Sequence, residues 1–116
     1  MADARRKFGN AAEQNAAAFL IEKGITIVAR QYRNKFGEVD LIAKDGEEFV
    51  MVEVKARNNH DFGYPEESVT RSKLRKIAIV GEHFMSDHPN IDWRIDVIAI
   101  EYDHSPPKIT HIIGVG

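Results

Sequence analysis

The sequence has 116 residues and a mass of 13.1 kDa, which is enough for one domain with a hydrophobic core and too little for two. Its formal net charge of -2 excludes a surface that attracts polyanions everywhere, although one basic face could still bind nucleic acid. The absence of cysteine excludes disulfides and thiolate chemistry, so any metal must bind oxygen or imidazole ligands. No apolar run approaches membrane-spanning length and no signal peptide is recognisable, so we expect a cytoplasmic protein that forms a single domain over residues 1–116.

The first predicted element is an amphipathic helix that ends before Gly24. Its apolar face consists of residues at helical spacing: Phe8, Ala12, Ala16, Phe19 and Leu20. Glu13 lies about 20° from Leu20 on a helical wheel of ~100° per residue, at the border of this face. The sequence leaves two interpretations open, an ordinary surface carboxylate or an acid that reaches a functional site.

Three β-rich runs follow the helix, at residues 25–33, 38–44 and 48–56. Asp45-Gly46 indicates a hairpin between the second and third runs. Because the links are short, we predict an antiparallel meander packed against the first helix.

Four charged side chains interrupt the second and third runs: Glu38, Asp40, Glu53 and Lys55. Since side chains alternate between the faces of a strand, the two charges of each run share one face of that strand. If the loop is Asp45-Gly46, Glu38 lies opposite Glu53; if the loop is residues 45–48, Asp40 lies opposite Glu53. Either loop places all four charges on one face of the sheet, whereas a three-residue loop would separate them unless a bulge restored the phase.

Two carboxylates on adjacent strands can share a hard cation, because Mg²⁺ prefers oxygen ligands and is typically held by one or two carboxylates together with substrate phosphate. Asp40 and Glu53 fit that role, and the ammonium group of Lys55 could orient a water or offset charge in a phosphorane-like transition state. The alternative is a structural salt-bridge set. Three acids with one lysine would leave carboxylates that repel one another, which favours a cation.

Thr70 can cap a second helix, whose first two turns carry four cations: Arg71, Lys73, Arg75 and Lys76. Cations are disfavoured near a helix N-terminus, so this cluster does not serve the helix dipole. It is either a solvated face or a surface that contacts phosphate groups. The polar segment 58–69 before the helix is a typical place for handling substrate. We predict that nucleic acid binds through this segment, the helix start and Arg57.

An apolar strand is predicted over residues 92–102 and a short last strand over residues 109–115. Asp96 lies in the middle of the first of these and needs a partner there, so we expect it to be structural. Three arginines could supply that partner: Arg30, Arg33 and Arg94. The predicted element order is αβββαββ, and the predicted fold class is α/β with a mixed sheet.

Asp40 and the tripeptide Glu53-Val54-Lys55 resemble the PD-(D/E)xK motif of nucleases with the restriction-endonuclease-like fold. A wider pattern is more specific, and its members are Gly9, Ala12-Glu13, ARQYR at residues 29–33, GEVDLIA at 37–43, VEVKAR at 52–57, Lys73 and RIDVIAI at 94–100. Together these resemble the YraN-like family of small bacterial proteins, which is related to archaeal Holliday junction resolvases. The resemblance covers roughly residues 9–113.

This resemblance implies a restriction-endonuclease-like core and, more loosely, a Mg²⁺-dependent nuclease that cuts branched or otherwise structured DNA, with Mn²⁺ as an alternative ion. It implies Asp40 and Glu53 as metal ligands, with the carbonyl group of Val54 completing the shell. Lys55 would assist the nucleophilic water, and Glu13 would match the first-helix acid of resolvase-like relatives.

One departure from the motif is Val39, which stands where the proline that names the motif would precede the aspartate. The rival hypothesis is a non-catalytic domain on the same scaffold that binds DNA or a partner protein. The sequence leaves open which DNA structure would be cut and whether the protein forms a homodimer.

Overall fold

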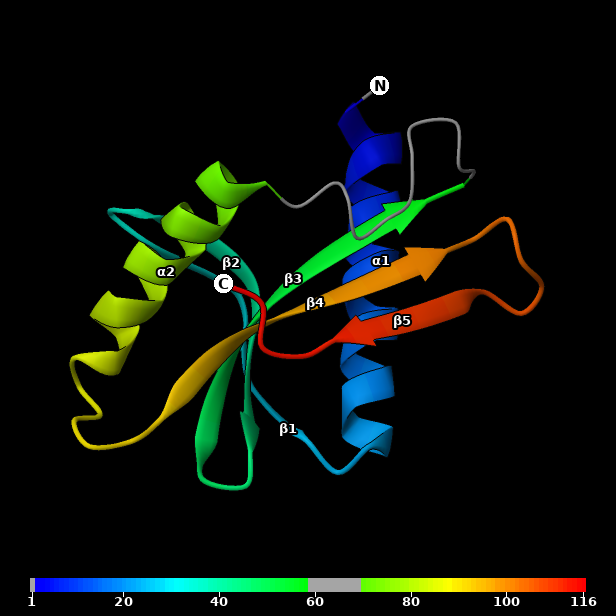
Figure 1. Cartoon of the computed structure of the whole chain (residues 1–116). Coiled ribbons are helices and arrows are strands. Elements are labelled where there is room, and N and C mark those ends of the chain that lie inside the picture. Colours follow the sequence, from blue (N-terminus) through cyan, green and yellow to red (C-terminus); the bar gives the residue numbers. More distant parts are fainter. Residues whose placement is uncertain (1, 59–69) are drawn as a thin grey trace.

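The computed structural model describes residues 2–58 and 70–116, with side chains from residue 9 onward in the first range. The elements within these ranges are α1 (Ala2–Glu22), β1 (Thr26–Asn34), β2 (Gly37–Asp45), β3 (Glu48–Arg57), α2 (Arg71–Met85), β4 (Trp93–Glu101) and β5 (Lys108–Ile112) (Figure 1). Their order confirms the predicted αβββαββ. The predicted substrate-handling segment lies outside the described residues, apart from Asn58.

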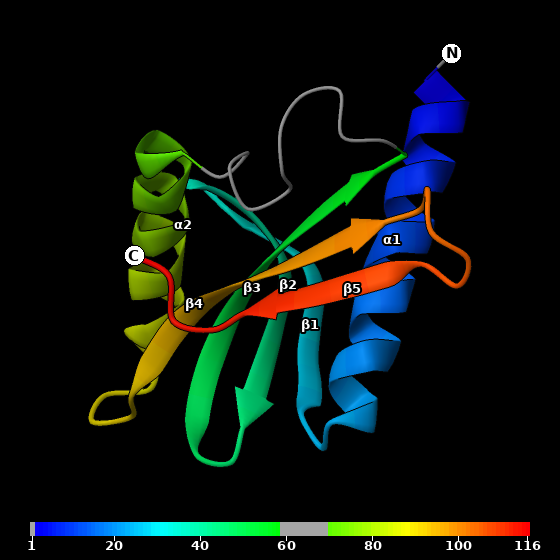
Figure 2. The ribbon, with the colours of Figure 1, turned by 45° about the vertical axis from the view of Figure 1, so that its right-hand side comes forward.

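The strands of the described residues form one mixed sheet in the order β1-β2-β3-β4-β5. The β1–β2–β3 meander is antiparallel as predicted, β3 and β4 are parallel, and β5 is antiparallel to β4. Figure 2 shows the sheet between α1 and α2. This arrangement confirms the α/β fold class and is consistent with a restriction-endonuclease-like core.

Each helix packs its apolar stripe on a different face of the sheet, which produces two separate cores. The α1 core includes Ala16 and Leu20 against Val52, and the α2 core includes Ile77 against Met51. Residues 51 and 52 lie on opposite faces because side chains alternate along β3. Neither α1 nor α2 combines the length and apolar character needed to cross a membrane.

The ends of both helices follow the predicted signals. Gly24 has a φ of 88°, and its amide donates to the carbonyl of Ile21, so the left-handed residue that stops α1 is a glycine as expected. Thr70 caps α2, and its hydroxyl oxygen accepts a hydrogen bond of 3.1 Å from the amide of Lys73. The first turn of α2 is therefore fixed by its own sequence.

The β2–β3 turn differs from both predicted loops. Asp45 pairs with Glu48, so the loop is Gly46-Glu47, and Gly46 has a φ of 64° as the first central residue of a type II′ turn requires. The pairing register is nevertheless the one predicted for a loop of residues 45–48, because Leu41 pairs with Val52. Asp40 and Glu53 are thus the next residues along the two strands.

The sheet splits at this point. Pairing between β2 and β3 ends at Leu41–Val52, whereas β1 and β2 stay paired to Asn34–Gly37 and β3 and β4 to Arg57–Glu101. The β1–β2 turn bends toward α2, and the ends of β3 and β4 run toward the N-terminal half of α1 (Figures 1 and 2). The split leaves part of the β3 backbone without a strand partner on its β2 side.

Asp96 is fully buried and has the partner that the sequence predicted, which is Arg94 among the three candidates. The guanidinium Nε of Arg94 donates to Asp96 Oδ1 at 2.9 Å, the amide of Gly114 donates to the same oxygen at 2.9 Å, and His111 Nε2 lies 2.7 Å from Oδ2. Burial acts to raise the pKa of Asp96, but these hydrogen bonds outweigh it and hold the pKa below its ordinary value. The carboxylate is a satisfied structural group.

Candidate functional site

A pocket of about 380 Å³ lies where β2 and β3 separate. Five ionisable side chains line it: Glu13 from α1, Asp40 from β2, Glu53 and Lys55 from β3, and Lys73 from α2. The structure thus brings together the four residues that the sequence suggested for catalysis. It adds Lys73, which the sequence suggested for nucleic-acid binding.

Beyond the last β2–β3 pair, the side chain of Asp40 replaces the backbone of β2 as the hydrogen-bond partner of β3. Its Oδ2 accepts a hydrogen bond of 2.8 Å from the amide of Val54. Since the N–H and C=O groups of one residue leave a strand on the same side, the carbonyl of Val54 also faces the β2 side of β3. Carboxylate oxygens and one backbone carbonyl therefore meet at the split.

Glu53 is the most unusual carboxylate of the pocket. It is only 6% exposed, and its Oε1 lies 3.2 Å from the ammonium nitrogen of Lys73. Burial, together with the charge of Asp40 and a hydrogen bond to it, raises the pKa of Glu53 to about 7, while Lys73 acts in the opposite direction. Asp40 and Glu53 are close enough to share a proton.

The amines of Lys55 and Lys73 lie within hydrogen-bonding reach of each other. Burial and then the neighbouring Lys73 lower the pKa of Lys55. Burial also acts to lower the pKa of Lys73, but the hydrogen bond to Lys55 and the carboxylates of Glu53 and Asp40 outweigh it, so that pKa is raised. Of the two amines, Lys55 gives up its proton more readily.

Glu13 reaches the site and is not simply a solvated surface residue. It is partly buried, and burial followed by the charge of Asp40 raises its pKa, whereas a hydrogen bond with Gln31 acts to lower it. Gln31 has a φ of 49°, rare for a residue other than glycine, and its Nε2 donates to Asn10 Oδ1 at 3.1 Å. In the sequence, Gln31 is marked only by its position in the ARQYR run.

Glu38 does not line the pocket, so the expectation that four charges act together on one face is wrong for this residue. Its Oε2 accepts a hydrogen bond of 2.6 Å from Arg33 of β1. The physical reason is an irregularity at Asp40: Val39 packs in the α2 core and Leu41 in the α1 core, although they are two residues apart. Regular alternation would place both on one face.

The basic residues predicted to contact nucleic acid are distributed around the pocket. Lys73 is inside it, whereas Arg71 and Lys76 are exposed on α2. Arg75 borders a different hollow of about 490 Å³ between α2, β4 and the last residues. Arg57 is half-buried at the end of β3. Nucleic-acid binding by these residues stays a prediction.

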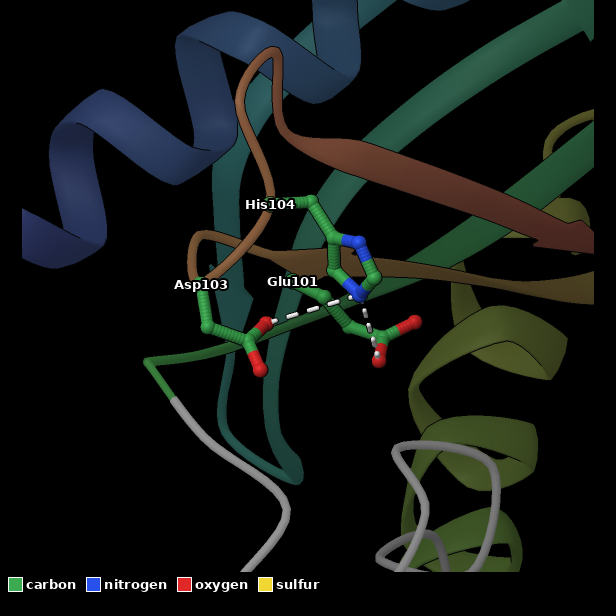
Figure 3. A group of neighbouring side chains, drawn as sticks. All are labelled: Glu101, Asp103 and His104. Atoms are coloured by element: carbon green, nitrogen blue, oxygen red, sulfur yellow. Dashed lines mark ion pairs between the residues drawn. The ribbon is translucent and has the colours of Figure 1, made fainter.

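A second group of ionisable side chains, which the sequence analysis did not identify, lies at the end of β4 (Figure 3). His104 Nε2 is 3.9 Å from Glu101 Oε1 and 3.8 Å from Asp103 Oδ1. Glu101 pairs in register with Arg57, so the group borders the end of β3 two residues beyond Lys55. The ligand atoms of these three residues lie close enough together to hold a metal ion, although exposed acidic groups often cluster without one.

Comparison with known proteins identifies the family. The sequence model of the family described as "Uncharacterised protein family UPF0102" matches residues 12–100 of this chain. The chain belongs to the UPF0102 (YraN) family. The region matched by UPF0102 contains all five ionisable residues of the pocket.

Among the UPF0102 relatives, one from Caldicellulosiruptor saccharolyticus is 42% identical over 98 residues, covering 83% of each chain. One from Rhodococcus jostii is 43% identical over 104 residues, covering 86% of this chain and 87% of the relative. One from Desulforapulum autotrophicum is 37% identical over 111 residues, covering 94% and 92%. These matches confirm the family that the sequence motifs indicated.

Proposed function

We propose that this UPF0102 protein is a cytoplasmic, Mg²⁺-dependent endonuclease that hydrolyses phosphodiester bonds in branched or otherwise structured DNA, with Mn²⁺ as an alternative ion. The observation that carries the proposal is the convergence of Asp40, Glu53 and Lys55 in one pocket at the split of the sheet. A salt-bridge set alone would explain this arrangement less well, because two carboxylates face each other there.

The donor set fits a hard divalent cation. Asp40 and Glu53 lie within hydrogen-bonding reach, and Glu53 is buried with a pKa raised to about 7, so the two negative charges oppose each other. The amide of Val54 donates to Oδ2 of Asp40, and the contact between Asp40 and Glu53 brings a second carboxylate to the same place. Together with the carbonyl of Val54, these are the oxygen donors that Mg²⁺ prefers. A cation held by them would supply Lewis-acid stabilisation of the phosphate and activation of a water.

The chain's own residues would orient the reaction. Lys55 shares a face of β3 with Glu53, so its amine can hydrogen-bond the attacking water and balance charge on the phosphate. Glu13 lines the pocket from α1 and could accept a hydrogen bond from the same water. The water oxygen forms a bond to phosphorus, the bond from phosphorus to the leaving deoxyribose oxygen breaks, and the proton of the water ends on that oxygen.

The decisive experiment combines metal binding with cleavage. Calorimetry with Mg²⁺ or Mn²⁺ should show binding to the wild type and none to Asp40→Asn. Labelled linear, flapped and four-way DNAs should be cut only with metal, and Glu53→Ala or Lys55→Ala should slow cleavage by on the order of 10²–10³ while the fold persists. The matched control is Glu38→Gln, which removes a carboxylate two residues from Asp40 but outside the pocket, and should retain both properties.

The outcomes separate the alternatives. Metal-independent DNA binding without cleavage of any of these DNAs would favour a non-catalytic DNA-binding domain. Large destabilisation by Glu53→Ala or Lys55→Ala would favour the structural salt-bridge set. If Glu38→Gln lost activity as completely as Asp40→Asn, the pocket would not be the site.

The path of the DNA can be tested through the exposed basic residues of α2. A net acidic protein with an acidic pocket repels DNA unless local cations outweigh that field. Arg71→Glu with Arg75→Glu should weaken DNA binding and reduce the salt dependence of the affinity by about two phosphate contacts. Lys44→Glu with Lys108→Glu changes the net charge equally and should have a smaller effect. Equal effects of the two pairs would remove α2 from the binding face.

A further inference from the structure

Lys73 differs from the other cations at the start of α2 because its side chain enters the pocket. Arg71, Arg75 and Lys76 belong to the same two turns, and none of them lines it. The hydrogen bond from the amide of Lys73 to Thr70 fixes the turn from which the side chain departs. Its direction toward β3 is therefore a consequence of the helix cap and of the packing of α2.

The contact that Lys73 makes is with a candidate metal ligand. Its ammonium nitrogen lies 3.2 Å from Oε1 of Glu53, the carboxylate that also faces Asp40. An ammonium group and a divalent cation at the same carboxylate repel each other, so they compete for it. The Lys73 side chain is 40% exposed and the Glu53 side chain 7%, which means that the lysine end of the pair can move into solvent and the glutamate end cannot.

We propose that Lys73 exchanges partners: it holds the Glu53 carboxylate in the pocket until a divalent cation takes its place, and its ammonium group then turns to the phosphate of the substrate. This inference rests on the proposed nuclease function. A flexible four-carbon side chain with three rotatable N–H donors suits such an exchange of partners. The Arg94–Asp96 pair is the opposite case, because its carboxylate is fully buried and held by three groups at once.

The test measures metal affinity without DNA and cleavage with DNA on the same variants. Lys73→Met should bind Mn²⁺ or Mg²⁺ about tenfold more tightly, because a like charge beside the ligand is gone. The same variant should cut DNA at saturating metal on the order of a hundredfold more slowly. Lys73→Arg keeps the charge and should restore metal affinity to near the wild-type value and recover part of the cleavage rate.

The matched control for metal affinity is Lys76→Met, which removes the same charge from the same helix, about one turn further along and outside the pocket. It should leave metal affinity unchanged. Weaker metal binding by Lys73→Met, an equal gain in Lys76→Met, or failure of Lys73→Met to fold would overturn the proposal.

The two proposals fail in different ways. If Asp40→Asn abolishes metal binding and cleavage but Lys73→Met matches the wild type in both, the nuclease stands and the role of Lys73 falls. If no DNA is cut but Lys73→Met still binds metal more tightly, the competition at Glu53 stands and the nuclease activity falls.

Discussion

Two buried carboxylates lie side by side in the sheet and meet opposite conditions. Val52 pairs with Asp96 and Glu53 pairs with Val97, so the two acids are neighbours in register and point to opposite faces. Asp96 has a lowered pKa because Arg94, Gly114 and His111 satisfy it. Glu53 has a raised pKa because burial and Asp40 oppose its charge and the lysine beside it compensates only in part.

Structural and functional carboxylates of this β-sheet differ in their neighbours. Burial of a carboxylate is common to both sites and decides nothing. What differs is how the surrounding groups hold the carboxylate: Asp96 is held by Arg94, Gly114 and His111, whereas Glu53 has one ion-pair partner, Lys73, and faces a second acid, Asp40. A buried carboxylate that faces another carboxylate is a candidate for binding a cation.

The largest expected effect is a loss of folding stability when Asp96, the carboxylate with satisfied hydrogen bonds, is replaced. Asp96→Ala should lower the free energy of unfolding by about 3 kcal/mol, because the amide of Gly114 and the ring of His111 lose their buried partner, while Arg94 keeps Glu48 and Asp45. Urea unfolding at pH 7 measures the loss, and Asp92→Ala, at an exposed position one residue before β4, should cost less than about 0.5 kcal/mol. Equal stability of Asp96→Ala and the wild type would end the structural assignment.

At Glu53, by contrast, we expect replacement of the carboxylate to raise the folding stability. Its folded pKa of about 7 lies above the ordinary value of 4.5, so the wild type loses stability as the pH rises from about 4.5 to 7. Glu53→Gln lacks this loss and, in the presence of a chelator, should be more stable than the wild type by on the order of 2 kcal/mol at pH 8. The difference should disappear below about pH 4.5.

The matched control for this pH dependence is Glu38→Gln, which alters an exposed ion pair with Arg33 and should change stability by less than about 1 kcal/mol at either pH. A variant Glu53→Gln that is less stable than the wild type at pH 8 would show that Glu53 is satisfied like Asp96, and the comparison would collapse.

A smaller effect is expected at the helix cap that directs Lys73. Thr70→Ala removes the hydrogen bond to the amide of Lys73 and should lower the free energy of unfolding by about 1 kcal/mol. Thr70→Ser retains the hydroxyl group and should stay close to the wild type, as thermal unfolding of the three proteins would measure. Loss of stability by Thr70→Ser equal to that of Thr70→Ala would indicate that packing of the threonine methyl group, and not the cap, is what α2 requires.

Local signals in the sequence determined much of the fold. Gly24 and Thr70 mark the end of α1 and the start of α2 because one supplies a left-handed residue and the other a cap, and both effects act within a few residues. The antiparallel meander follows from short links between strands. The candidate metal ligands Asp40 and Glu53 could be selected because charges are costly in apolar strands.

Tertiary structure decided which charges act together. The split between β2 and β3 depends on packing against two different helices. The same packing produces the irregularity in β2 that keeps Glu38 out of the pocket and leaves Asp40 in it. The contacts of Asp96 with His111 and Gly114 join residues far apart in the chain, and the entry of Lys73 into the pocket depends on where α2 docks. A sequence pattern specifies the face of a strand or helix, but the distance between faces of different elements is set only when the core is packed.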